Sequence, residues 1–134
     1  MGILEQIVER KRREVARRRA RTGQVPESAP YESPAIAPFE RATAALRRGR
    51  SAWPGVIAEI KMRSPSAGVI RRRVPGEVAT IARAFQDAGA SAVSVLCDGP
   101  GFGGTPLDIR RAARAGSLPL LFKEFVIDPI QVTL

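Results

Sequence analysis

Residues 56–66, VIAEIKMRSPS, decide how the rest of the chain is interpreted. The stretch is a run of mostly apolar residues that contains two opposite charges, Glu59 and Lys61, at alternate positions. Because alternate side chains of a β-strand share a face, Ile57, Glu59 and Lys61 are expected to point the same way. The apolar run predicts a buried parallel strand, which the turn-forming Ser-Pro-Ser sequence ends.

The two charges lie near the C-terminal end of this predicted strand, where parallel α/β folds place their active sites. A charge in a buried strand costs free energy unless it is paired or used. We therefore interpret Glu59 and Lys61 either as catalytic residues or as a structural ion pair at the end of a strand. Their spacing alone does not choose between the two.

Strands and helices alternate through the remainder of the chain. Strands are predicted at residues 56–61, 92–97 and 118–125, and helices at residues 78–88 and 107–115. Such alternation predicts β-α units in a parallel sheet, joined by right-handed crossovers. The pattern does not distinguish the first part of a barrel from a small open sheet.

The first 50 residues form a different region. Helices are predicted at residues 2–20 and 39–47, and residues 24–38 between them hold four prolines and read as an extended linker. The chain is thus predicted to have an N-terminal helical extension and linker at residues 1–50, and a β-α-β-α-β domain at residues 51–134.

Composition excludes several classes of protein. Hydrophobic residues make up 44% of the 134 residues, which is typical of a globular domain. One cysteine permits no internal disulfide, and the absence of histidine excludes Ser-His-Asp chemistry and argues against zinc or another metal site. No apolar run approaches the ~20 residues of a membrane span, and the N-terminus lacks the apolar core of a secretory signal. A cytoplasmic protein without a membrane partner is expected.

The net charge of +9 is concentrated near the N-terminus, where residues 10–21 hold eight basic residues and one acid, Glu14. This run lies on a predicted amphipathic helix and has no interleaved aromatic residues for base stacking. We interpret it as a solvated helix face and expect no specific nucleic-acid partner. Its positive field would also attract a phosphorylated, carboxylated substrate.

Three segments resemble the indole-3-glycerol phosphate synthase family, in the family's order and near its spacing. They are VIAEIKMRSPSAGVI at 56–70, SVLCDGPGFGGTPLDI at 94–109 and LPLLFKEFVIDPIQV at 118–132. Residues 3–18 of the predicted N-terminal helix are also similar to the family's opening. The resemblance implies a TIM (β/α)8 barrel whose N-terminal helical extension lies over the active-site end. The chain would supply only three parallel strands, since such barrels need about 250 residues.

The reaction implied by the resemblance belongs to tryptophan biosynthesis and makes the protein a carbon-carbon lyase (carboxy-lyase). It closes a ring in 1-(2-carboxyphenylamino)-1-deoxyribulose 5-phosphate, with loss of carbon dioxide and then water, and leaves indole-3-glycerol phosphate. No cofactor is implied. The enzyme alternative is a related phosphate-binding barrel such as phosphoribosylanthranilate isomerase, against which the Glu-Ile-Lys and Ser-Pro-Ser sequences together argue.

The resemblance also implies roles for three charged residues. Lys123 matches the general acid, Lys61 would bind the substrate's carboxylate or phosphate, and Glu59 would orient the lysines or move protons. From the residues alone, Lys123 reads equally well as a strand-end lysine that reaches solvent.

Four further residues are expected to line the substrate pocket: Ser64, Pro65, Phe102 and Phe125. Phe102 lies in the glycine-rich stretch DGPGFGGT at 98–105, predicted to be a loop, which by itself is a weak phosphate signal. The alternatives stay open, because Ser64 and Pro65 fit a simple turn and Phe102 fits a plug over the core.

Later strands of the family supply another catalytic glutamate, an asparagine and the main phosphate loops, and none of these can be carried over to this chain. The first alternative is therefore a catalytically inactive half-barrel that self-associates or pairs with a second half. The second is a basic nucleic-acid-binding protein that uses residues 10–21. In either case the chain alone is not expected to turn over substrate at a useful rate.

Overall fold

The structure is a computed structural model that describes residues 2–22, 37–47 and 54–132. The chain divides into two compact units, one made of residues 1–33 and 125–134 and the other of residues 34–124. Most of the predicted linker at 24–38 lies outside the described residues. The division into domains at residue 50 stays a prediction.

The first unit contains helix α1 (Ile3–Thr22) and the short 3₁₀ helix η1 (Pro129–Gln131). Residues four apart form the buried face of α1, as an amphipathic helix requires: Ile7, Lys11 and Val15. Asp128 caps η1 by accepting the Ile130 backbone N–H at 3.0 Å, and Arg19 of α1 donates to the same carboxylate at 2.6 Å. Among the described helices, none has the length and apolarity needed to cross a membrane.

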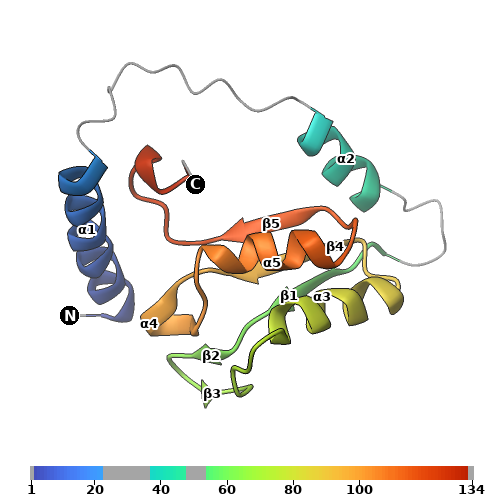
Figure 1. The fold of residues 1–134 in the computed structure, drawn as a ribbon, viewed down its shortest axis with the longest axis horizontal. Helices are drawn as coiled ribbons and strands as arrows, with labels where there is room; N and C mark the ends of the chain where they lie inside the picture. Colours follow the sequence, from blue (N-terminus) through green and yellow to red (C-terminus); the bar gives the residue numbers. More distant parts are fainter. Residues whose placement is uncertain (1, 23–36, 48–53, 133–134) are drawn as a thin grey trace. The chain divides into compact units, whose positions relative to one another are not determined.

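Three parallel strands form the main sheet of the second unit, in the order β1 (Ile57–Ile60), β4 (Ala92–Leu96) and β5 (Leu120–Lys123). Helix α3 (Glu77–Asp87) connects β1 to β4, and α5 (Leu107–Ala115) connects β4 to β5 (Figure 1). The predicted alternation is therefore confirmed. Each strand is shorter than predicted.

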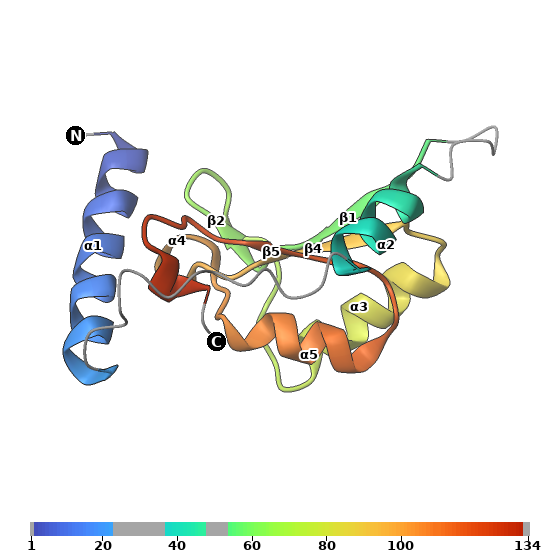
Figure 2. The same cartoon turned by 90° about the horizontal axis from the view of Figure 1, so that it is seen from above.

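Helices α3 and α5 cover one face of this sheet (Figure 2). The core between them is made of alternate residues of the strands and the inner faces of the two helices: Ile60, Val78, Ala82, Val93, Val95, Ala112 and Ala115. The opposite face carries Ile57 and Leu121, which are 48% and 52% exposed. The central strand β4 is buried along its whole length.

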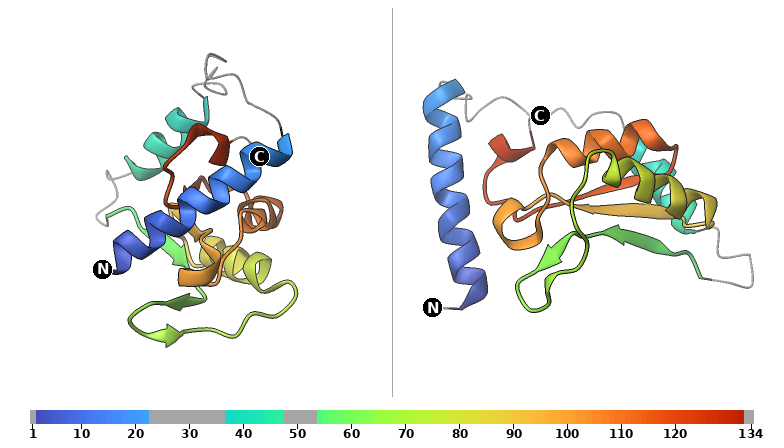
Figure 3. Two further views of the ribbon diagram at one scale, coloured as in Figure 1. Left: turned by 90° about the vertical axis from the view of Figure 1, so that its left-hand side faces the viewer. Right: turned by 60° about the horizontal axis from the view of Figure 1, so that its bottom comes forward.

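Two segments at the C-terminal ends of the strands are more ordered than the predicted loops (Figure 3). Residues 98–105 contain helix α4 (Gly99–Phe102), because Asp98 caps it by accepting the Gly101 backbone N–H at 2.8 Å. The Ser-Pro-Ser turn joins two short antiparallel strands, β2 (Arg63–Ser64) and β3 (Gly68–Val69). The loop predicted at 98–105 was therefore wrong over α4, whereas the turn expected at Ser64 and Pro65 is confirmed.

Helix α2 (Ala37–Leu46) lies at the other end of the sheet. A shallow cavity is lined by Arg41, Ala44 and Ala45 of α2 together with residues that precede the three strands, at 54–55, 89–91 and 117–119. The chain before β1 approaches α2 so closely that a Cβ on Gly55 would lie 3.2 Å from the Leu46 carbonyl oxygen. For α2, the implied position over the active-site end is therefore wrong.

Candidate active site

Glu59 lies between two lysines on the open face of the sheet. Its Oε2 accepts a hydrogen bond from Lys123 Nζ at 2.6 Å, and its Oε1 lies 3.4 Å from Lys61 Nζ. Ser94 of the central strand lies beside them, with its Oγ 3.5 Å from Glu59 Oε2. The three charged residues to which the resemblance assigns roles therefore meet on one face of the sheet.

The parallel register explains why the three charges meet. Glu59 is paired with Ser94, and Lys123 is paired with Leu96, two residues further along β4. Because side chains two apart share a face, Glu59 and Lys123 project from the same face of the sheet, from the two strands that flank β4. Lys61 follows directly after β1 and continues the alternation.

The two lysines keep Glu59 ionised. Partial burial raises the pKa of its carboxyl, but the hydrogen bonds and positive charges of Lys123 and Lys61 together outweigh burial and hold the pKa below its usual value. The cluster of one carboxylate and two ammonium groups therefore carries a net positive charge at neutral pH. Such a cluster can bind an anionic substrate and present a proton donor to it.

We expect the pKa of the Glu59 carboxyl to lie below the ordinary value for glutamate. In the Lys123→Met variant, which loses the nearer cation, its pKa should be higher than in the unchanged chain. The stability that the ion pairs contribute is present above the unfolded-state pKa and is lost as pH falls through the lowered folded-state value. Carbon-detected NMR between pH 7 and pH 2.5 measures both midpoints, and an unchanged-chain midpoint above the ordinary value would contradict the expectation.

Ser64 and Pro65 lie on the hairpin that follows β1. Ser64 is buried, and its Oγ accepts the Ala67 backbone N–H at 3.0 Å, so the hydroxyl stabilises the turn. Pro65 is exposed at the tip. These contacts account for the turn, and the predicted binding role of both residues stays a prediction.

Two aromatic residues were also expected at the substrate. Phe102 is the last residue of α4 and is half-buried at the C-terminal end of β4, the end where Glu59 and Lys123 meet. Its expected place in the substrate pocket stays a prediction. Phe125 belongs to the first unit, where its carbonyl oxygen accepts a hydrogen bond from Gln131 Nε2 at 3.0 Å.

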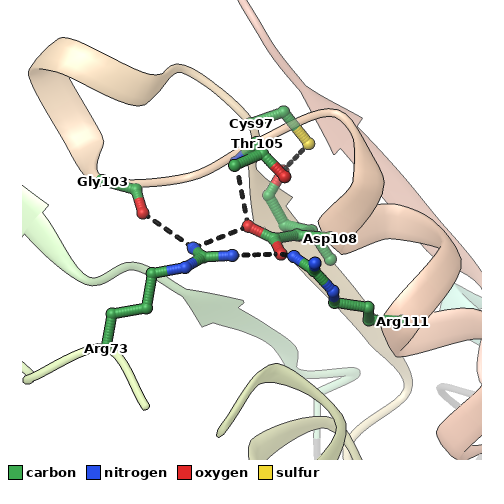
Figure 4. Close-up of polar contacts among 7 residues, drawn as sticks. Arg73, Cys97, Gly103, Thr105, Asp108 and Arg111 are labelled. Atoms are coloured by element: carbon green, nitrogen blue, oxygen red, sulfur yellow. Dashed lines mark hydrogen bonds and ion pairs between the residues drawn. The ribbon is translucent and has the colours of Figure 1, made fainter. Parts of the chain in front are cut away.

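A second charged cluster was missed by the sequence analysis. Asp108, which is only 1% exposed, binds the guanidinium groups of Arg73 and Arg111 (Figure 4). Burial raises the pKa of the Asp108 carboxyl, but the two arginines and the Thr105 backbone N–H bring it below its usual value. An aspartate in the first turn of a helix is ordinary in a sequence, and no pattern links it to an arginine 35 residues away.

In the described part of the chain, no three histidine, cysteine, aspartate or glutamate side chains gather closely enough to hold a metal ion. The expected lack of a metal or cofactor stays a prediction. Cys97 is buried in the core and donates a hydrogen bond to the Val95 carbonyl at 3.3 Å.

Comparisons with known proteins agree with the sequence resemblance. The family model described as indole-3-glycerol phosphate synthase matches residues 4–134. A curated relative from Rhodospirillum rubrum, named indole-3-glycerol phosphate synthase, is 47% identical over 131 residues, which is 97% of this chain and 48% of the relative. The chain therefore spans about half the length of the curated relative it matches.

Proposed function

The chain belongs to the indole-3-glycerol phosphate synthase family, and we propose that it supplies the general acid and part of the substrate site for that family's reaction. The family fold is a TIM barrel, and β1, β4 and β5 would be the first three of its eight strands. The substrate would be 1-(2-carboxyphenylamino)-1-deoxyribulose 5-phosphate. The product would be indole-3-glycerol phosphate, formed with loss of carbon dioxide and water.

One observation carries this proposal: a single carboxylate, Glu59, binds Lys61 and Lys123 at the C-terminal ends of two strands. Ring closure needs a cation near the ketose oxygen, which must gain a proton as it becomes a hydroxyl and later leaves as water. Lys123 fits this role because it is the last residue of β5 and its ammonium group lies nearer to Glu59 than that of Lys61 does.

The other two residues complete the proposed site. Lys61 would hold the substrate carboxylate that leaves as carbon dioxide, or its phosphate. Glu59 would hold both lysines in place and aimed at the substrate, since each of its two carboxylate oxygens lies against one of them. An acid that stays charged at neutral pH suits a reaction that must protonate a leaving oxygen. The proposed enzyme class is a carbon-carbon lyase.

The proposal is tested in a joined protein, in which residues 1–134 are followed by the C-terminal half of the Rhodospirillum rubrum relative. Indole-3-glycerol phosphate formation is followed by its fluorescence. We expect Lys61→Met to raise KM and to lower kcat, because a cation that binds an anion acts in the ground state and in the transition state.

The control for Lys61→Met is Arg110→Met, which removes a cation from the exposed side of α5. It should leave both constants within about twofold, since surface substitutions away from a site have small effects. A joined protein that folds but forms no product would contradict the proposed function. Equal losses in the two variants would contradict the role of Lys61.

A nucleic-acid-binding function is less well supported by the contacts within α1. Glu9 pairs with Arg12 and Arg13 on its own helix, and Glu14 pairs with Arg10 and Lys11. These ion pairs reduce the positive field that a phosphate backbone would meet. A steep salt dependence of DNA binding by the chain would favour this alternative.

A further inference from the structure

Asp108 gathers contacts from three segments of the second unit. Its Oδ1 accepts hydrogen bonds from Arg73 Nη2 and Arg111 Nη1, each at 2.6 Å. Its Oδ2 accepts from Arg73 Nη1 and from the Thr105 backbone N–H, each at 2.9 Å. The pair with Arg73 is thus bidentate, which fixes the guanidinium in orientation as well as in position.

Arg73 also makes one contact outside the Asp108 carboxylate. Its Nη1 donates to the carbonyl oxygen of Gly103 at 2.8 Å (Figure 4). Gly103 is the residue directly after Phe102 and ends helix α4 in the left-handed conformation, with φ of 71°. A displacement of the Gly103 carbonyl would therefore displace the aromatic side chain next to it.

The segment that carries Arg73 is attached to the hairpin of Ser64 and Pro65. The backbone N–H groups of Ile70 and Arg71 both donate to the Met62 carbonyl at 2.9 Å, which closes the base of the hairpin. On the other side, a Cβ on Gly103 would lie 3.1 Å from Arg63 Cγ and 3.2 Å from Met62 Cβ. The hairpin and the end of α4 therefore pack against each other with no spare room.

Asp108 does not need Arg73 in order to remain paired. Arg111 lies three residues further along the same helix and approaches the same carboxylate, and the Thr105 N–H also remains. Loss of Arg73 would leave Asp108 with a cation and a backbone donor. It would also remove the hydrogen bond from Arg73 Nη1 to the Gly103 carbonyl.

We propose that Arg73 is a positioning residue that ties the end of α4, and with it Phe102, to the hairpin of Ser64 and Pro65. Asp108 holds its guanidinium in the required orientation. Arg73 itself does not touch the substrate. The inference rests on the proposed function for its meaning in catalysis, because Phe102 is expected to pack against the substrate ring.

The first test uses the 134-residue chain and needs no activity. Hydrogen exchange of the backbone amides of residues 99–105 is measured in the unchanged chain, in Arg73→Gln and in Arg111→Gln. Arg73→Gln should speed exchange in this segment at least tenfold, whereas the amides of β4 should stay protected. Arg111→Gln is the matched control, since it also removes one arginine from Asp108 but leaves the Gly103 contact in place.

Arg73→Lys adds a second check on geometry. A lysine keeps the charge but lacks the planar fork, so it reaches either Asp108 or the Gly103 carbonyl and not both. Exchange at 99–105 should therefore stay close to that of Arg73→Gln. Unchanged exchange in Arg73→Gln, or equal acceleration in Arg111→Gln, would overturn the proposal.

The second test uses the joined protein and separates the two proposals. Arg73→Gln should raise KM by roughly tenfold with a smaller change in kcat, because an aromatic contact with the ring acts in the bound substrate as well as in the transition state. Arg111→Gln should leave the ratio of the two constants unchanged. If the joined protein forms no product while hydrogen exchange at 99–105 responds as expected, the proposed function fails, but the role of Arg73 in holding the end of α4 stands. If product forms and Arg73→Gln leaves KM unchanged, the positioning role is overturned.

Discussion

Lys123→Met in the joined protein is expected to lower kcat by roughly 10²–10⁴-fold, with a much smaller change in KM. Methionine keeps the length and the apolar stem of lysine and removes only the ammonium group. The carboxylate that loses this partner remains beside Lys61, whose Nζ lies 3.4 Å away, so the variant is not left with an isolated charge. The loss in rate would therefore report the missing proton donor and not a disturbed fold.

The measurement is a steady-state fluorescence assay on the joined protein, with Arg110→Met as the variant that removes an unrelated exposed cation. Circular dichroism and a urea unfolding curve check that Lys123→Met folds as the unchanged protein does. A rise in KM alone would mean that Lys123 binds an anion and that the acid is another group.

The 134-residue chain by itself is expected to self-associate and to form no detectable indole-3-glycerol phosphate. The sheet has open edges at β1 and β5 in the described residues, and unpaired strand edges invite pairing with another chain. Its uncovered face holds Ile57 and Leu121, each about half exposed. Removal of apolar surface from water contributes about 25 cal/mol per Å², which favours burial of this face against a second copy.

Sedimentation velocity over a range of concentrations tests this association. A double variant, Ile57→Lys with Leu121→Lys, should shift the chain towards monomer, because a lysine on each contact site opposes burial. The matched control is Leu107→Lys, which changes a leucine on α5 that is 54% exposed, against 52% for Leu121. A well-folded monomer that turns over substrate near one per second would overturn both parts of the expectation.

Much of the fold follows from the residues alone. Alternation within 56–61 places Glu59 on the face opposite Ile60, and the structure agrees, since Ile60 is buried in the core and Glu59 is not. The helix predicted at 107–115 has those bounds in the structure. Lys123 is brought to Glu59 by parallel pairing, which the β-α-β pattern predicts without any knowledge of the family.

Other features depend on contacts that a local pattern does not contain. Helix α4 forms in a stretch with four glycines because a buried aspartate caps it, and the glycines by themselves favour a loop. Gly104 after it cannot be replaced, since a Cβ there would lie 1.9 Å from the Leu96 carbonyl oxygen. The contact between Arg73 and Asp108 joins residues 35 positions apart. These features arise from tertiary packing, which decides where local preference is weak.

The order of the strands in the sheet is the same as their order in the chain, β1, β4 and β5. Each new strand therefore pairs with a strand that has already been synthesised, and each helix returns the chain to the adjacent position in the sheet. During synthesis on the ribosome, the second unit could assemble in steps as it emerges, without waiting for any residue that comes later. Pairing each strand with the one made just before it keeps the sequence separation between paired strands short for a parallel sheet. A nascent chain would then offer the two lysines and the glutamate on a sheet that is already in register.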